Sequence, residues 1–393
     1  MNDSGLKTTL KETNWLLLLL CILTASVGVL IVTSATQRYN AVGQFFGRDS
    51  IVMMAAAAAG IVFCFIISLM DYEVFTRRLF ILIICAFCVG ILVILFIPGI
   101  GKAPDDRKDS HVWLKFGSIF FQPSELVKIG FVLTFSTHLA AVGKEINKIK
   151  VLIPLLVHGA VPILLVIGTG DMGSALVFMA MFGGMLFMAG LKWYYFLAAI
   201  IAVGAALPLA WMRVFDPFQK ERFLAVYSPG SLSPERLETV IYQQQMGVNA
   251  ISGGGLLGQG LFKGEYTQSG AVPVSWNDMI FAAVGEELGF AGAAGLLVLL
   301  SGVILVCALA GRKSRDDAGR LICCGIGLMI GVQVVINIGM CMKFLPCIGI
   351  ALPFISAGGS SNLCVWLGIG LVLSVSRFSV EHGPTRVRFI ARR

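Results

Sequence analysis

Residues 15–35 read WLLLLLCILTASVGVLIVTSA, an apolar run without a charged side chain. A helix needs about 20 mostly apolar residues to cross the hydrocarbon core of a bilayer. About ten stretches satisfy this requirement, at 15–35, 51–70, 79–97, 120–139, 151–167, 173–190, 194–212, 278–310, 319–342 and 356–375. The sequence therefore predicts an all-α polytopic membrane protein with about ten transmembrane helices.

The overall composition excludes a water-soluble fold. Of the 393 residues, 57% are hydrophobic and 13% are charged, whereas a soluble domain is about 25% charged. The small residues Thr33, Ser34 and Ala35 after the first apolar run are compatible with a signal peptide. An uncleaved anchor is the better interpretation, because nine further spans follow and no polar mature domain does.

Lysine and arginine residues set the expected orientation, since cytoplasmic loops carry an excess of them. Most of the positive residues fall in the loops that share a side with the N-terminus, and in a basic tail at 379–393. We therefore expect a multi-pass protein of the bacterial cytoplasmic membrane with both termini in the cytoplasm. The net charge of +8 then reflects topology and attraction to anionic membrane lipids, and it does not indicate nucleic-acid binding.

We expect one domain over residues 1–393, with one large extracytoplasmic loop at 215–277, between helices 7 and 8. This loop is polar and ends in a glycine-rich stretch, Gly253-Gly254-Gly255-Leu256-Leu257-Gly258-Gln259-Gly260. Glycines let a backbone turn at positive φ or approach a ligand closely. A flexible linker would have the same composition, so both interpretations are open.

Asp278 follows this loop directly, at the start of the eighth apolar stretch. As an N-cap or first-turn residue it would accept hydrogen bonds from backbone N–H groups and favour the positive end of the helix dipole. As a carboxylate at the membrane surface it would instead be able to remove a proton from a sugar hydroxyl. The residue alone favours the cap.

Other carboxylates lie within apolar stretches, where they are costly and indicate function by default. On a straight helix, Glu286 and Glu287 lie roughly 12 Å deeper than Asp278. Glu125 and Lys128, three residues apart, can form a local ion pair. Asp171 follows a short turn and can act as an N-cap.

The last span begins after Pro353 with Ser356-Ala357-Gly358-Gly359-Ser360-Ser361. Small residues permit close helix packing. Ser360 and Ser361 are also able to bind a head group, and the sequence favours packing.

Four motifs, in this order along nearly the whole chain, resemble those of the SEDS family (shape, elongation, division and sporulation). They are Gln122-Pro123-Ser124-Glu125-x-x-Lys128, the glycine stretch from Gly253 to Gly260, Asn277-Asp278-x-Ile280-Phe281 through Glu286-Glu287-Leu288-Gly289, and Pro353-x-x-Ser356-x-Gly358-Gly359-Ser360. Gly264-Glu265-Tyr266-Thr267-Gln268 is similar to the elongation branch of the family. The chain departs from the family pattern at Trp276-Asn277, Gly170 and Ala357, which leaves the donor-site contacts open.

The resemblance implies a peptidoglycan glycosyltransferase that polymerises lipid II, the undecaprenyl-diphosphate-linked disaccharide pentapeptide, at the outer face of the cytoplasmic membrane. It implies that Asp278 matches the essential aspartate of the family. In such a reaction a carboxylate takes the proton of the attacking hydroxyl, and the leaving diphosphate needs positive charge. We expect substrate contacts from Arg222, Lys263, Gln243, Gly254 and Ser360.

A divalent cation, Mg²⁺ or Mn²⁺, is a possible cofactor, and it would share the diphosphate because no dense carboxylate cluster is present. Expected partners are a class B penicillin-binding protein transpeptidase and other elongation or division machinery. A flippase or ion-coupled transporter of lipid-linked precursors is the main alternative, because the buried charges would also suit a charge-relay pathway. A noncatalytic scaffold is a third.

Overall fold

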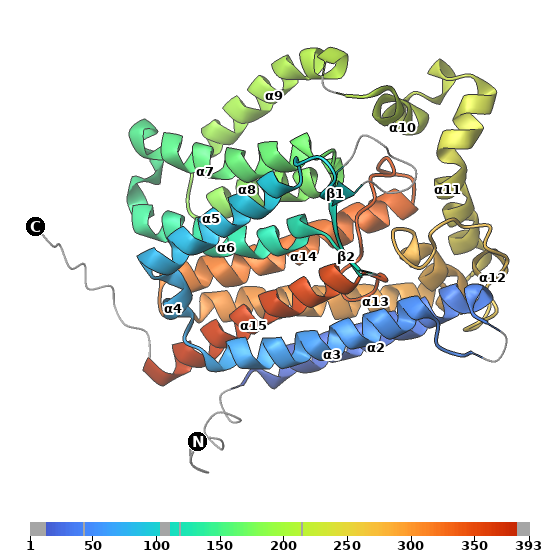
Figure 1. Cartoon of the computed structure of the whole chain (residues 1–393), viewed down its shortest axis with the longest axis horizontal. Helices are drawn as coiled ribbons and strands as arrows, with labels where there is room; N and C mark the ends of the chain where they lie inside the picture. The colour runs from blue at the N-terminus through green and yellow to red at the C-terminus, as the bar shows by residue number, and fades with distance from the viewer. Residues whose placement is uncertain (1–12, 42–43, 103–110, 118, 214, 383–393) are drawn as a thin grey trace, which may run out of the picture.

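The computed structural model describes residues 13–41, 44–102, 111–117, 119–213 and 215–382. Most of the helices lie side by side in one bundle (Figure 1). Eight helices are long and apolar enough to cross a membrane: α2 (Trp15–Thr36), α3 (Arg48–Leu69), α6 (Pro123–Val142), α7 (Ile149–Gly168), α9 (Trp193–Arg213), α13 (Ile280–Arg312), α14 (Asp317–Cys341) and α15 (Gly359–His382). The shorter apolar helices are α5 (Arg78–Ile94) and α8 (Met172–Met188).

Each of the ten predicted spans corresponds to one of these helices, which confirms the predicted fold class. Three predicted starts, at residues 120, 278 and 356, lie before their helices. Phe120 belongs to a small antiparallel sheet that the sequence did not predict, formed in order by β1 (Gly101–Lys102), β2 (Trp113–Phe116) and β3 (Ile119–Phe121). Asp278 and Ser356 lie in turns.

The bundle has two ends. At one end, α2 finishes and α13 begins, and Figure 1 shows the connecting helices α11 and α12 on this side. We call it the loop end. Helices α10 (Pro217–Tyr227), α11 (Pro234–Gly253) and α12 (Glu265–Ser269) and the 3₁₀ turn η3 (Pro229–Ser231) form much of the predicted loop. At the opposite end, the Arg377 side chain donates to Thr13 Oγ1 (2.8 Å) and joins the start of the described chain to its last helix. The short helix α4 (Tyr72–Thr76) also lies at this end.

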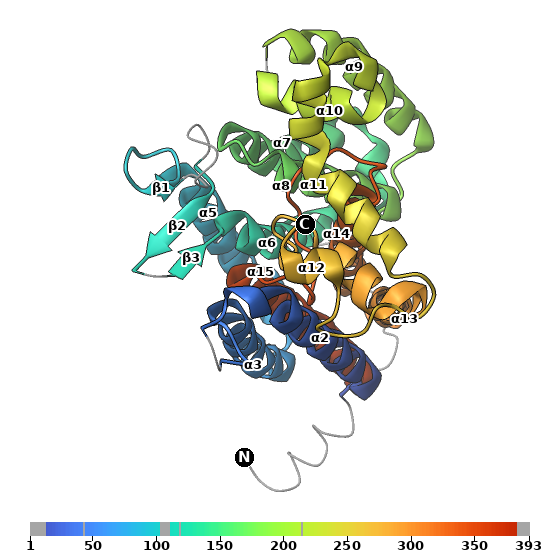
Figure 2. The ribbon, with the colours of Figure 1, turned by 90° about the vertical axis from the view of Figure 1, so that its right-hand side faces the viewer.

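Close packing between helices uses small residues. A Cβ atom on Gly60 of α3 would lie 2.6 Å from Trp366 Cδ1 of α15, and one on Gly370 would lie 3.0 Å from the Cα of Cys64. Helix α15 therefore lies directly against the backbone of α3, and its contacts with α3 are the most extensive between any two elements. Figure 2 shows the same pair from the loop end.

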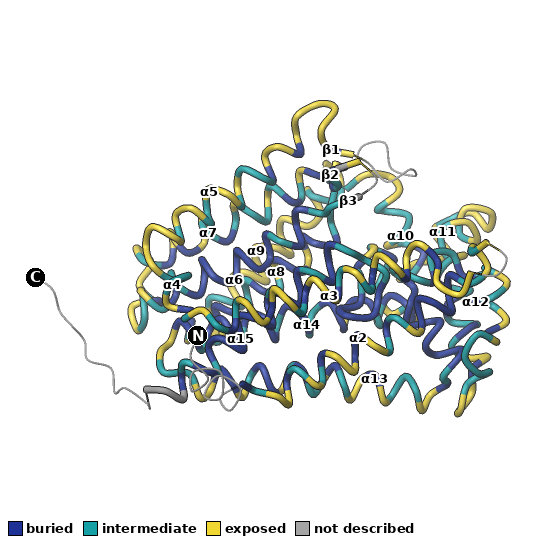
Figure 3. Tube along the Cα trace, turned by 60° about the horizontal axis from the view of Figure 1, so that its bottom comes forward, coloured by how far each residue is buried: buried dark blue, intermediate teal, exposed yellow. Residues whose placement is uncertain are grey.

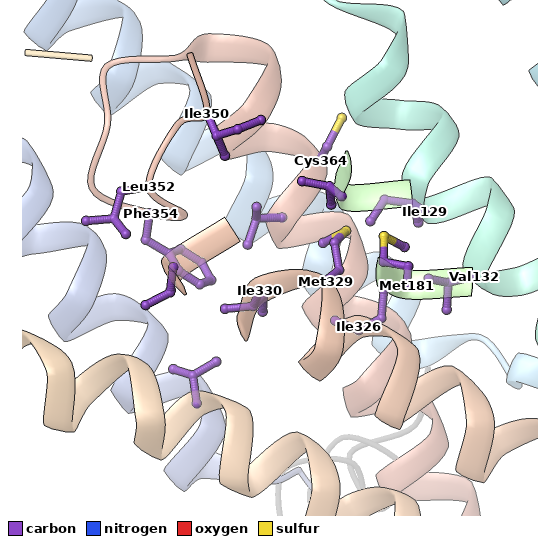
Figure 4. Close-up of a cluster of buried hydrophobic side chains, with 14 of the residues drawn as sticks. Ile129, Val132, Met181, Ile326, Met329, Ile330, Ile350, Leu352, Phe354 and Cys364 are labelled. Carbon is purple, nitrogen blue, oxygen red and sulfur yellow. The ribbon is translucent and has the colours of Figure 1, made fainter. Parts of the chain in front are cut away.

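One cluster of the buried core lies between α6, α8, α14, α15 and the segment before α15. The buried side chains that Figure 4 labels lie there: Ile129, Val132, Met181, Ile326, Met329, Ile330, Ile350, Leu352, Phe354 and Cys364. Buried residues follow the inner faces of the helices and exposed residues the outer faces (Figure 3). Many exposed residues are large and apolar, among them Leu79, Met212 and Val298, as expected for side chains that contact lipid. None of the residues of α9, all of which the structure describes, is buried.

Candidate active site

Asp278 lies at the loop end, in a turn of residues 273–279 that leads into α13. The N-cap position of α13 is Met279, so Asp278 precedes the cap and is neither the N-cap residue nor a residue of the first turn. The side chain of Asp278 is half-buried. Its carbonyl accepts hydrogen bonds from Asn337 Nδ2 (2.8 Å) and from Cys341 Sγ (3.6 Å), both on the last turns of α14.

The segment 346–357, between α14 and α15, packs against this turn. Gly349 has φ of +73°, and a Cβ atom there would lie 3.1 Å from Asp278 Oδ2. A left-handed backbone and the neighbouring carboxylate both favour glycine at this position. Ser356 Oγ donates to Asn277 O at 2.8 Å, which ties the far end of the segment to the same turn.

Two further predicted site residues reach the same segment. Arg222, on α10, donates from Nη1 to Cys347 O (2.8 Å), and its guanidinium lies 4.3 Å from the centre of the Phe218 ring. Gln243, on α11, accepts from Cys347 Sγ (3.5 Å) and donates to Pro273 O (3.3 Å). The fold therefore brings Asp278, Arg222 and Gln243, from the turn before α13 and from α10 and α11, to the start of one short segment, at Cys347 and Gly349.

Glu286 and Glu287 lie in a separate cluster, at a break in α13. Gly289 has non-helical dihedral angles of φ 66° and ψ −168°, so α13 is not one straight helix. Glu287 accepts from Ser34 Oγ (2.7 Å), in the last turn of α2. The break follows both carboxylates, whose side chains are buried, and their depth in the membrane stays a prediction.

Both carboxylates hold neighbouring segments in place. Glu286 accepts from the backbone N–H groups of Tyr266 (2.6 Å) and Thr267 (2.8 Å) and from Thr267 Oγ1 (2.6 Å), at the start of α12. Glu287 also accepts from Gln268 Nε2 (3.0 Å). These hydrogen bonds, most of them from polar groups of the connecting loop, offset part of the free-energy cost of burying the two carboxylates.

The glycine-rich stretch packs on the same break. A broken helix leaves carbonyl and N–H groups without hydrogen-bond partners. The glycine-rich stretch supplies the missing partners. Gln259 N donates to Glu286 O (3.0 Å), Gly260 N donates to Glu287 O (3.0 Å), and Phe290 N donates to Gly255 O (2.9 Å). A Cβ atom on Gly254 would lie 1.9 Å from Gly285 O. Backbone packing alone therefore explains the glycine at position 254. Lys263 lies near Gly260. Substrate binding by Gly254 and by Lys263 stays a prediction.

The predicted ion pair between Glu125 and Lys128 is present. The Lys128 Nζ atom lies 2.7 Å from Glu125 Oε1, and the side chains are 0% and 8% exposed. Both residues are on the first turns of α6. The local pairing that the spacing of three residues indicated is confirmed.

Asp171 has the predicted capping role and one more. It caps α8 by accepting from Ser174 N (2.9 Å), and its other oxygen accepts from Gln122 Nε2 (2.8 Å) and Ser124 Oγ (3.1 Å). Ser360 Oγ accepts from Gln122 N at 3.4 Å. These residues join α6, α8 and α15, which favours packing for Ser360, while head-group binding stays a prediction.

Within the part of the chain that the structure describes, no group of three or more His, Cys, Asp or Glu side chains is placed to hold a metal ion. A site made by protein side chains alone therefore does not fit these residues. The predicted divalent cation would need ligands from the substrate.

Residues 14–381 match the model of the FtsW/RodA/SpoVE family, which is described as a cell cycle protein. The chain belongs to this family. It is 31% identical over 387 residues to the probable peptidoglycan glycosyltransferase FtsW of Geobacter metallireducens, covering 94% of this chain and 97% of that protein. It is 30% identical over 292 residues to the peptidoglycan glycosyltransferase MrdB of Escherichia coli K12, covering 72% and 76%.

Two solved structures have the same fold. A chain of a peptidoglycan synthase complex, in which polymerization and crosslinking are coordinated, superposes with a TM-score of 0.78 at 23% identity, covering 93% of this chain and 98% of that one. The rod shape determining protein RodA of Thermus thermophilus superposes with a TM-score of 0.67 at 22% identity, covering 93% and 97%. The resemblance to the SEDS family is thus confirmed, while the elongation branch stays a prediction because relatives named FtsW and MrdB both match.

The sequence missed three residues that hold this site. Asn337, Cys347 and Gly349 each contact Asp278 or the segment beside it, yet they belong to none of the four motifs. The sequence signal was Asn337 itself, which with Gln333 is one of two amides in the apolar part of α14.

Proposed function

We propose that this chain, a peptidoglycan glycosyltransferase of the FtsW/RodA/SpoVE family, polymerises lipid II into glycan strands with Asp278 as the general base. The observation that carries the proposal is the arrangement at the loop end. A half-buried carboxylate lies in a turn that three partners hold, beside a segment that binds Arg222.

The chemistry requires a sugar hydroxyl to attack an anomeric carbon as the diphosphate leaves. A carboxylate within hydrogen-bond reach can accept the hydroxyl proton during the attack. Inversion at the anomeric carbon follows from a single displacement. Asp278 provides the carboxylate. Because residue 349 is glycine, no side chain from that position lies against the carboxylate.

The leaving diphosphate needs cationic partners. Arg222 is the first candidate, because its guanidinium is oriented by Cys347 O and by the Phe218 ring. Arginine suits this task because its planar fork can bind two phosphate oxygens at once. Lys263 is the second candidate. A Mg²⁺ or Mn²⁺ ion would supply further positive charge on the diphosphate, held in part by the substrate's own oxygens.

We further propose that the chain acts in cell elongation, at the outer face of the cytoplasmic membrane, together with a class B penicillin-binding protein. The similarity of residues 264–268 to the elongation branch supports the first part. The structural likeness to a chain of a peptidoglycan synthase complex supports the second.

The flippase or transporter alternative depended on buried charges that a relay would use. In the described residues, Lys128 pairs with Glu125, and Glu286 accepts three hydrogen bonds from α12. These groups already have structural partners, which favours the glycosyltransferase.

The test is polymerisation of lipid II by the purified Asp278→Asn protein. The amide keeps the size of the side chain but has no useful basicity, so we expect a loss on the order of a hundredfold or more, with lipid II still bound. Asp216→Asn is the matched control: Asp216 caps α10 at the same end of the bundle, and asparagine caps equally well. Near-normal strand synthesis by a folded Asp278→Asn protein would refute the assignment.

A further inference from the structure

The turn that carries Asp278 belongs to no helix or sheet, and local hydrogen bonds pair only part of its carbonyl groups. The three successive carbonyls of residues 276, 277 and 278 each have a partner outside the turn. They accept in turn from Ala357 N, Ser356 Oγ and Asn337 Nδ2, each at 2.8 Å. The backbone around the carboxylate is therefore held from outside the turn, by α14 and by the segment before α15.

Asn337 has a special place among these partners. Its side chain is fully buried, and the amide nitrogen donates to Asp278 O (2.8 Å) and also to Ile350 O (2.7 Å). An amide nitrogen has two protons, and here each is directed to a different segment. One side chain thus joins the Asp278 turn to the 346–357 segment.

The second bond concerns the carboxylate as well. Ile350 follows Gly349, whose backbone lies against Asp278 Oδ2. By holding Ile350 O, Asn337 also holds the neighbouring backbone of Gly349, which lies beside the Asp278 carboxylate. It therefore sets both the main chain of Asp278 and one boundary of its side chain.

We propose that Asn337 is a positioning residue for Asp278, and that it holds the carboxylate in the orientation in which it accepts the hydroxyl proton. This inference rests on the proposed function. An aspartate at this position has the same shape but would direct negative charge at two carbonyl oxygens. A leucine fills similar space but donates to neither carbonyl, so Asp278 O keeps only the longer hydrogen bond from Cys341 Sγ.

The experiment measures kcat and KM for lipid II polymerisation, and the thermal unfolding of each protein in detergent, for Asn337→Leu and Asn337→Asp. Displacing a catalytic group by about 1 Å can cost on the order of a hundredfold in rate. We expect kcat to fall by about ten- to a hundredfold and KM to change little, because the residue does not touch the substrate. Asn337→Gln, which keeps both donors on a longer chain, should retain more kcat than Asn337→Leu.

Gln244→Leu is the matched control. Gln244 is also a buried amide whose nitrogen donates to two carbonyls, Met340 O and Leu345 O, both at 2.8 Å, but neither belongs to the turn of Asp278. It should lower the unfolding temperature about as much as Asn337→Leu and leave kcat near the wild-type value. An equal loss of kcat in this control would overturn the inference, since general loosening would then explain both.

Wild-type kcat in a folded Asn337→Leu or Asn337→Asp protein would also overturn it, and if one variant does not fold, the other decides. Failure of the proposed function has a different signature. In that case the wild-type protein makes no strands, or Asp278→Asn remains active. An active wild type, an inactive Asp278→Asn and an unimpaired Asn337→Leu defeat the inference alone.

Discussion

Two ion pairs on neighbouring parts of the chain have the same spacing and length but different surroundings. Lys128–Glu125 and Lys148–Glu145 are both three residues apart with an N···O distance of 2.7 Å. The side chains of the first pair are 0% and 8% exposed, and those of the second are 66% and 61% exposed. Breaking a buried pair leaves a charge without compensation, whereas water replaces the partner of an exposed one.

We therefore expect Glu125→Ala and Lys128→Ala each to destabilise the protein by about 3–5 kcal/mol, and the double substitution to cost less than the sum. Glu145→Ala should change stability by less than about 1 kcal/mol. Unfolding in detergent measures all four proteins. Strict additivity of the two buried substitutions would mean that each has a separate partner.

The element that shapes the loop end is the broken helix α13. Its first part runs beside α11, where a Cβ atom on Gly247 would contact Met279 and one on Gly254 would contact Gly285 O. The break at Gly289 redirects the chain into its long apolar part. Because the glycine stretch pairs with the groups that the break exposes, the two features depend on each other.

A prediction follows for Gly289→Ala. Its φ and ψ are accessible essentially to glycine alone, and such strain costs about 1–3 kcal/mol. A Cβ atom there would also lie 2.2 Å from Gly258 N, so the backbone must shift. We expect lower stability and reduced activity, measured by thermal unfolding and strand synthesis.

Gly295→Ala provides the control on the same helix. No atom lies within 4 Å of a Cβ at Gly295, and alanine favours a helix over glycine by about 0.5–1 kcal/mol. The protein should be as stable as the wild type or slightly more stable. A Gly289→Ala protein with equal stability would show that the break is not required.

At the scale of the whole molecule, the arrangement of its ends makes the topology testable. Ser231 ends η3 at the loop end, and Arg315 follows α13 at the opposite end, where it pairs with Glu73 of α4. We expect a reporter fused after Ser231 to be extracytoplasmic and one fused after Arg315 to be cytoplasmic, because of the bias of Lys and Arg among the loops. Both reporters on one side would contradict the ten-span topology.

The partner is tested by copurification from native membranes. Strand synthesis without crosslinking does not build a wall, so we expect a class B penicillin-binding protein to be recovered with this chain in gentle detergents. Asp278→Asn should recover the same partner, because the substitution leaves the fold intact. Repeated absence of any transpeptidase would count against the proposed assembly.

The sequence by itself determined the features that depend on neighbouring residues. Apolar length alone located the ten helices, a spacing of three residues predicted the Glu125–Lys128 pair, and a short turn predicted the Asp171 cap. The motif order pointed to Asp278 and to the family. Hydropathy and helix geometry act within a few turns of chain, so one sequence contains enough information for these inferences.

Only the tertiary structure decided which distant segments meet. The break at Gly289, the role of the glycine stretch and the carbonyls that Asn337 binds all depend on backbone groups left without a local partner. Such groups must be satisfied wherever the fold supplies a donor, and the donor to Asp278 O lies on α14. Residue spacing carries no record of these pairings, because they arise when helices far apart in sequence pack side by side.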